Sequence, residues 1–155
     1  MAGVRLASET DGPAIGRLMV DFNTEFGDPI PPAEVTGERI GAHVASGEAT
    51  VLLAGDGSGN DAGLAVLRFR PALYEDGLDS YLEELYVARA LRGQGIGRAL
   101  LEEAMRVAKE RGAIRMDLGT EEDDTAARAL YESAGFDNHC GKPGGPVSYF
   151  YEREL

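Results

Sequence analysis

Apolar side chains recur at strand and helix spacings through the first half of the chain. Residues 4–7, Val-Arg-Leu-Ala, predict a short strand, and Asp11-Gly12-Pro13 is a helix-start sequence. The helix predicted after it has an apolar stripe made of Ile15, Leu18, Met19, Phe22 and Phe26. A weaker helix is predicted from Val35 to Gly47. Two strand-like runs within 50–69, separated by Gly, Asp and Asn residues, predict an antiparallel hairpin.

The second half of the chain alternates strand-like and helical patterns. Residues 79–88 predict a strand, a glycine-rich turn follows, and the apolar stripe of 96–111 predicts the strongest helix of the chain. Another strand is predicted at 114–118, a further helix at 126–134, and a last strand from Val147 to Glu152. Strands separated by helices in the middle, with antiparallel pairs on either side, indicate a mixed α/β sheet.

The length and composition fit one soluble domain over residues 1–155. The chain has 155 residues, of which 43% are hydrophobic and 27% charged, enough to bury one sizeable core. No apolar stretch reaches the roughly 18 residues of a membrane helix, and the first residues lack the apolar block of a signal peptide. We therefore expect a cytoplasmic protein with no membrane partner.

Charge and metal-ligand counts argue against several other functions. Lys and Arg number 15 and Asp and Glu 27, so the net charge is −12. This charge repels a phosphate backbone and favours cationic partners, so we expect no nucleic-acid binding. Cys140 is the only cysteine, and His43 and His139 are the only histidines. This set makes neither an internal disulfide nor a Cys/His zinc site, and we expect no metal.

The segment with the clearest chemistry joins the strand at 79–88 to the helix that follows. Its sequence from Leu91 to Leu100 is LRGQGIGRAL. Glycines permit unusual backbone angles and let phosphate oxygens approach N–H groups, and the helix dipole favours an anion. The loop lacks the Gly-Lys-Ser/Thr ending of a Walker A motif, and Arg98 stands where G-x-G-x-x-G needs its third glycine. The loop is therefore predicted to bind a pyrophosphate, but it is neither a Walker A loop nor a dinucleotide-binding loop.

The same residues resemble the acetyl-CoA loop of the GCN5-related N-acetyltransferase (GNAT) family, which has the pattern Arg/Gln-x-x-Gly-x-Gly/Ala. The matching residues are Arg92, Gly93, Gln94, Gly95, Ile96 and Gly97. Residues 82–87 resemble the family's strand that hydrogen-bonds the pantetheine arm, and 126–136 resemble its second motif. The resemblance is close over 80–137 and one of layout elsewhere. It implies the GNAT-like acyl-CoA N-acyltransferase fold, a central, mostly antiparallel sheet with a splayed parallel strand pair, flanked by helices.

The resemblance also implies which residues bind the cosubstrate, acetyl-CoA. The backbone N–H groups of 93–98 would hold its pyrophosphate, and the main chain of Leu85 and Val87 would pair with the pantetheine arm. The full set of implied cofactor-binding residues is Leu85, Tyr86, Val87, Arg92, Gly93, Gln94, Gly95, Ile96, Gly97 and Arg98.

The implied catalytic residues are a tyrosine and one of two glutamates. Tyr131 matches the family tyrosine that protonates the departing CoA thiolate. Glu84 or Glu83 is the predicted general base, acting through water on the acceptor amine. Because these two are neighbours in a predicted strand, we expect their side chains on opposite faces, with only one of them in a given pocket. Asp124 replaces an Asn that often contacts the cofactor in relatives, and we expect it to cap a helix instead.

The predicted function is that of an N-acetyltransferase that moves the acetyl group of acetyl-CoA directly to a primary amine. The acidic composition favours a cationic small-molecule acceptor such as an aminoglycoside or a polyamine. Two alternatives stay open, a protein N-terminal or lysine acetyltransferase and a non-catalytic acetyl-CoA-binding sensor or interaction module. The oligomeric state is open as well, and the resemblance allows a homodimer.

Overall fold

The structure, a computed structural model, describes residues 3–155. These fall into two compact units, residues 3–118 and Gly119–Leu155. The prediction of a single domain over 1–155 stays a prediction, because each unit is defined here only by its own contacts. Within residues 3–155, no helix is both long and apolar enough to cross a membrane.

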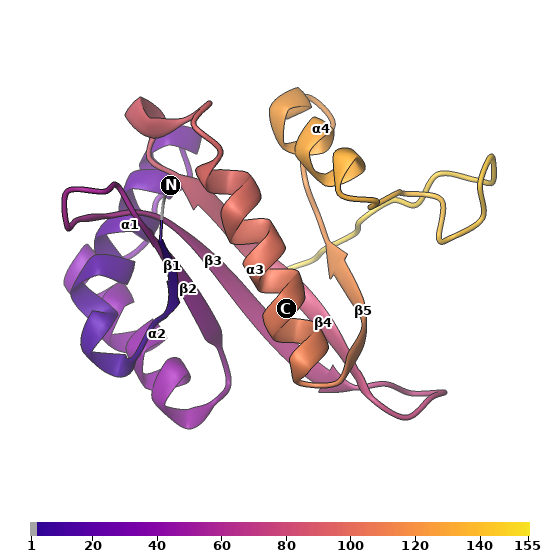
Figure 1. Cartoon of the computed structure of the whole chain (residues 1–155), viewed down its shortest axis with the longest axis horizontal. Coiled ribbons are helices and arrows are strands. Elements are labelled where there is room, and N and C mark those ends of the chain that lie inside the picture. The colour runs from indigo at the N-terminus through magenta and orange to yellow at the C-terminus, as the bar shows by residue number, and fades with distance from the viewer. Residues whose placement is uncertain (1–2) are drawn as a thin grey trace. The chain divides into compact units, whose positions relative to one another are not determined.

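The first unit is built on a five-stranded sheet whose strands lie side by side in sequence order (Figure 1). The strands are β1 (Val4–Leu6), β2 (Thr50–Gly55), β3 (Asp61–Pro71), β4 (Leu78–Val87) and β5 (Ala113–Leu118). Neighbouring strands pair antiparallel, except that β4 and β5 are parallel. The predicted fold class, a mostly antiparallel sheet with one parallel pair, is confirmed.

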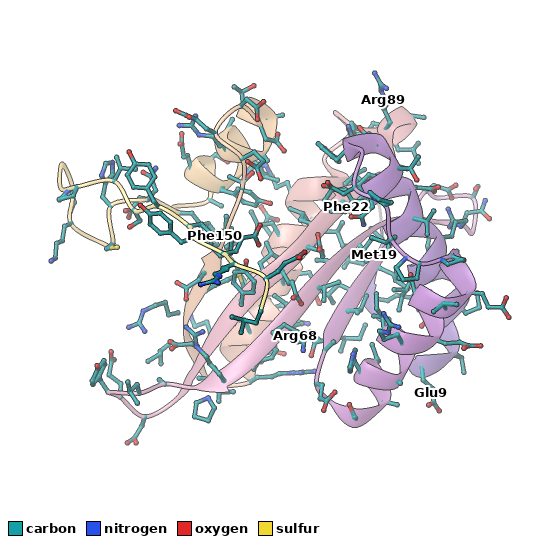
Figure 2. The ribbon with its side chains drawn as sticks, turned by 180° about the vertical axis from the view of Figure 1, so that it is seen from behind. Glu9, Met19, Phe22, Arg68, Arg89 and Phe150 are labelled. Atoms are coloured by element: carbon teal, nitrogen blue, oxygen red, sulfur yellow. The ribbon has the colours of Figure 1, made fainter. Side chains whose placement is uncertain are left out.

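Helices cover both faces of this sheet. The helices α1 (Gly12–Phe26) and α2 (Ala33–Ser46) lie on one face, and α3 (Ile96–Glu110) crosses the other (Figures 1 and 2). Successive strand residues point to opposite faces, which explains the two layers. On one face, Val51 and Val66 belong to the core under α1. On the other face, β3 approaches α3 so closely at Gly63 that an added Cβ would touch Leu100.

Two glycines allow α1 and α2 to cross in close contact. A Cβ added at Gly16 would collide with the backbone of Ala33, and one added at Gly37 would collide with the backbone of Gly12. A larger residue at either position would force the helices apart. The close crossing therefore sets the distance between α1 and α2, both of which supply walls of one pocket.

The second unit contains α4 (Thr125–Ser133). Asp124 caps this helix as expected, since its carboxylate accepts a hydrogen bond from the N–H of Ala127 at 3.1 Å. The rings of Tyr131 and Phe136 meet edge to face, with centroids 6.1 Å apart.

The predicted last strand is wrong, because residues 147–152 form no strand. Tyr149, Phe150 and Tyr151 have 77%, 71% and 86% of their surface exposed. The preference of aromatic residues for strands reflects packing on a half-buried pleated surface, whereas these three side chains are exposed. The expected antiparallel pairing after β5 is therefore also absent from the described residues.

Candidate functional site

A β-bulge in β4 places two neighbouring glutamates on one side of the sheet. In the pairing of β3 with β4, Val66 lies opposite Glu84 and Leu67 lies opposite Leu82, so Glu83 is an extra residue. An extra residue interrupts the regular alternation of side chains. Glu83 and Glu84 accordingly line the same pocket. The prediction that they face opposite sides is wrong, because it assumed a regular strand.

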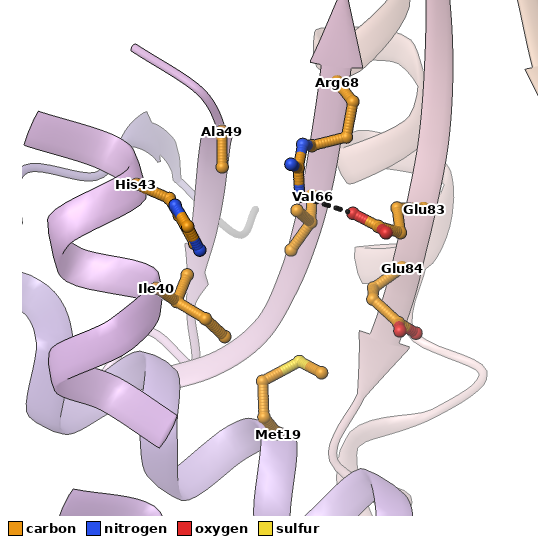
Figure 3. A pocket seen from close by; sticks show the side chains of 8 residues that line it. All are labelled: Met19, Ile40, His43, Ala49, Val66, Arg68, Glu83 and Glu84. Carbon is orange, nitrogen blue, oxygen red and sulfur yellow. Dashed lines mark hydrogen bonds and ion pairs between the residues drawn. The ribbon is translucent and has the colours of Figure 1, made fainter. Parts of the chain in front are cut away.

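The pocket lies in the first unit, between the two helices α1 and α2 and the strands β3 and β4, and has a volume of about 190 Å³ (Figure 3). Figure 3 shows its two sides, with helical residues facing the carboxylates of β4. Its apolar wall includes Met19 of α1, Ile40 of α2 and Val66 of β3. Its polar side chains are His43, Arg68, Glu83 and Glu84.

The two glutamates differ in their electrostatic surroundings. Glu84 is half-buried, and loss of hydration together with the negative charge of Glu83 raises the pKa of Glu84 to about 7. Glu83 is paired, because Nη1 of Arg68 donates to its Oε2 at 3.2 Å. Nδ1 of His43 lies 2.7 Å from Oε2 of Glu48. A carboxyl group that titrates near neutral pH can take up and release a proton, so Glu84 has the property of a general base.

Among the described residues, no strand pairs with one edge of β4 beyond the bulge. The pairing with β5 ends at Leu82, whereas β4 continues to Val87. On the other edge, the N–H of Ala88 donates to the carbonyl of Ala62 at 2.8 Å. Bonded and non-bonded pairs alternate in an antiparallel ladder, so the main-chain groups of Leu85 and Val87 point away from β3. These are the two residues whose main chain is predicted to bind pantetheine.

The glycine-rich loop leads directly into the N-terminus of α3. Gly93 and Gly95 have φ angles of 76° and 86°, a region that favours glycine. Gly95 is the N-cap residue and has no side chain that could occupy the end of the helix. The first N–H groups of a helix have no acceptor within it and carry the positive end of its dipole, which suits a phosphate. The other loop positions predicted to bind the cofactor are Gln94, Ile96, Gly97 and Arg98, of which Ile96 has a buried side chain.

Arg92 connects this loop to α1 and to the end of β4. Its two terminal nitrogens donate to the two carboxylate oxygens of Glu25, both at 2.7 Å, and its Nε donates to the carbonyl of Val87 at 3.0 Å. The pairing lowers the pKa of Glu25. The guanidinium also lies over the ring of Tyr86, which stacks on Phe22 with centroids 5.0 Å apart. Contact of Arg92 and Tyr86 with the cofactor stays a prediction, whereas their packing here holds the loop in place.

The predicted site residues are divided between the two units. Glu83, Glu84, residues 85–87 and residues 92–98 all belong to the first unit, and the structure brings the two glutamates together in one pocket. Tyr131 lies on α4 of the second unit, and its role as a proton donor stays a prediction.

Sequence reasoning did not find the other polar side chains of the pocket. His43 has no partner that the sequence reveals, and Arg68, the single basic residue of the predicted hairpin at 50–69, matches no motif. The signal that reveals both is the register of β3 with β4 together with the position of α2, neither of which follows from local patterns. Among the residues that the structure describes, no group of three or more His, Cys, Asp or Glu side chains is placed to hold a metal ion.

A sheet whose parallel strand pair separates beside a carboxylate pocket, with a glycine loop at the next helix N-terminus, is the arrangement of an N-acetyltransferase. Residues 15–136 match the model of the Acetyltransferase (GNAT) family. The chain belongs to this family.

Individual relatives agree with this assignment. The chain is 28% identical over 138 residues to aminoglycoside N(6')-acetyltransferase type 1 of Stenotrophomonas maltophilia, covering 86% of this chain and 85% of that protein. It is 36% identical to a protein of Arthrobacter sp. FB24 whose crystal structure carries an acetyltransferase assignment, with a TM-score of 0.88 and coverage of 100% and 97%. An aminoglycoside acetyltransferase from an uncultured soil metagenomic sample, solved with sisomicin, shares the fold at 18% identity, with a TM-score of 0.79 and coverage of 99% and 97%.

Proposed function

We propose that the chain transfers the acetyl group of acetyl-CoA directly to a primary amine bound in the pocket of Glu83 and Glu84. The observation that carries this proposal is the position of Glu84, which lines the pocket with a pKa of about 7 and precedes the unpaired edge of β4. Family membership supplies the reaction class, and the pocket supplies a base suited to it.

The first unit has the groups that would hold the cosubstrate. The main chain of Leu85 and Val87 would pair with the pantetheine arm, and the N–H groups of 93–98 would hold the pyrophosphate. The positive φ angles of Gly93 and Gly95 and the glycine N-cap of α3 fit such a ligand. When bound, acetyl-CoA supplies the activated acetyl thioester.

Two side chains would move the protons of the reaction. Glu84 accepts a proton from the acceptor ammonium, through water, so that the neutral nitrogen can form the new C–N bond. Tyr131 is the proposed donor of a proton to the sulfur as the C–S bond breaks, and it regains a proton from the nitrogen, which must lose a second one to become an amide. The products are then an acetamide and the CoA thiol, with no acyl-enzyme intermediate.

For the acceptor, we propose a small molecule with a cationic amine, a class to which aminoglycosides, polyamines and basic amino acids all belong. The net charge of −12 and the similarity to an aminoglycoside acetyltransferase support this class. A peptide N-terminus or a lysine side chain is the second candidate acceptor.

The proposal is tested by the release of CoA thiol from acetyl-CoA in the presence of purified protein. The acceptor panel contains aminoglycosides, polyamines, amino acids and short peptides, and Glu84→Gln is compared with Glu102→Gln as a control. Glu102 is exposed on α3, so its substitution removes the same charge at a distance from the pocket. We expect acceptor-dependent release by the wild type and by the control, and a fall of about 10²- to 10⁴-fold for Glu84→Gln.

Binding measurements separate the alternatives. Acetyl-CoA binding without turnover of any acceptor would favour the non-catalytic sensor, and turnover of peptides alone would favour the protein acetyltransferase. Equal rates for Glu84→Gln and the wild type would remove Glu84 from the mechanism.

A further inference from the structure

The pocket of Glu83 and Glu84 also contains a basic side chain. Arg68 lies on β3, and its contact with Glu83 uses the single nitrogen Nη1 (Figure 3). The side chain of Arg68 is 42% exposed, so a molecule in the pocket can reach it. A guanidinium has five N–H donors in a fork that matches a carboxylate. Arg68 can therefore hold a second carboxylate while it keeps its contact with Glu83.

The pocket is lined by one guanidinium, that of Arg68, as well as by the two carboxylates. Arg68 balances Glu83, and His43 is engaged with Glu48 at 2.7 Å. Glu84 is then the carboxylate left to attract the reacting ammonium. The pocket thus offers Glu84 to an amine and Arg68 to an anion. This pair of groups matches an acceptor that carries both an amine and an anionic group.

Arg68 and Glu84 line the same small pocket. Its volume of about 190 Å³ is below the roughly 300–1,000 Å³ of sites that enclose drug-sized ligands. Arg68 contacts Glu83, and Glu83 immediately precedes Glu84 in the chain. The amine and the anion of the acceptor should therefore be separated by only a few bonds.

We propose that the acceptor is a free amino acid, held by its carboxylate at Arg68 while its amine is acetylated beside Glu84. This inference rests on the proposed function and names its substrate class. Glu84 takes the first ammonium proton, the amine nitrogen bonds to the acetyl carbon, and the thioester C–S bond breaks. The second proton lost by the nitrogen replaces the one that Tyr131 gives to the sulfur, which leaves as the thiol. The net charge of −12 favours amino acids with a cationic side chain, so lysine and ornithine are the first probes.

Matched acceptors test the requirement for the carboxylate. Lysine is compared with cadaverine and with lysinamide, and ornithine with putrescine, by thiol release at saturating acetyl-CoA. These pairs keep the amines and remove or neutralise the carboxylate. We expect kcat/KM at least tenfold higher for lysine and ornithine than for their counterparts, with kanamycin among the poor acceptors.

Substitutions test whether Arg68 is the residue that binds the carboxylate of the acceptor. Arg68→Gln should lower kcat/KM for lysine at least tenfold more than for cadaverine, mainly through a higher KM. Arg68→Lys, which keeps the charge, should recover part of this loss. Arg70→Gln is the control, because Arg70 lies on the same strand but pairs with Asp79 and Asp117 outside the pocket. Thermal melting of each variant checks that it is folded.

The outcomes separate this inference from the proposed function. The amino-acid acceptor is wrong if kcat/KM for cadaverine, lysinamide or kanamycin equals that for lysine, or if Arg68→Gln lowers kcat/KM equally for all acceptors. Either result leaves the proposed transferase activity in place. If no acceptor in the panel is turned over, the proposed function fails and the amino-acid acceptor fails with it.

Discussion

Replacing Glu84 with Gln should make the protein more stable above neutral pH, although it removes the proposed base. Burial and the neighbouring charge of Glu83 raise the pKa of Glu84 from its ordinary 4.5 to about 7. The folded state therefore disfavours the ionised carboxylate relative to the unfolded chain. The contribution of Glu84 to stability is fully present below pH 4.5 and is lost as the pH rises through about 7. A glutamine has no charge to bury and avoids this loss.

The size of the effect follows from the two pKa values. The difference between 4.5 and about 7, at about 1.4 kcal/mol per pKa unit, gives an upper limit of about 3.5 kcal/mol. Glu84 is only half-buried, so solvent screening reduces the expected gain to about 1 to 2 kcal/mol. For a chain of this length, that gain raises Tm by roughly 3 to 6 °C.

Thermal unfolding at pH 5 and pH 8 measures this gain. The comparison uses the wild type, Glu84→Gln and the exposed control Glu102→Gln. Glu84→Gln should melt well above the wild type at pH 8 and close to it at pH 5, and the control should follow the wild type at both. A Tm difference between Glu84→Gln and the wild type that is the same at pH 5 and pH 8 would refute the raised pKa.

Four further outcomes test the site. The wild-type kcat/KM should rise with pH through about 7 as Glu84 ionises, and a flat profile would speak against a titrating base. Gly95→Glu should weaken acetyl-CoA binding at least tenfold in calorimetry, whereas Gly59→Glu, at another positive φ, should not. If both substitutions change the affinity equally, the phosphate does not bind at Gly95. Tyr131→Phe should lower kcat at least tenfold with acetyl-CoA affinity unchanged, and an unchanged kcat would remove Tyr131 from the mechanism. Glu25→Gln should raise the KM for acetyl-CoA at least threefold, because it breaks the bidentate pair of Glu25 with Arg92 that holds the glycine-rich loop. An unchanged KM would show that this pair does not position the loop.

Local patterns predicted the elements of the first unit well because each has a strong periodic signal. The helix at 96–110 carries a continuous apolar stripe, and the glycines at its start require a special backbone wherever they occur. The segment at 147–152 has residues that favour strands, yet it forms no strand. A strand also needs a paired neighbour, which strand preference alone does not supply, so the prediction there was wrong.

The candidate site was predictable as a set of residues but not as a geometry. Glu83 and Glu84 were identified from the resemblance, yet their shared pocket depends on one extra residue against β3. Arg68 was missed because its role depends on which residue of β4 lies near it. Register is decided by packing across the whole sheet, and a sequence read in short windows does not contain it.

The bulge in β4 has a consequence for how the length of this strand can change. Leu82 and Glu84 are two residues apart and would share a face in a regular strand, but here Leu82 faces α3 with Leu67, and Glu84 lies in the pocket with Val66. Deleting Glu83 would leave both pairings intact, whereas deleting a residue on either side would turn a core side chain toward the wrong layer. Position 83 is therefore the point in β4 where one residue can be lost without moving the rest of the strand out of phase.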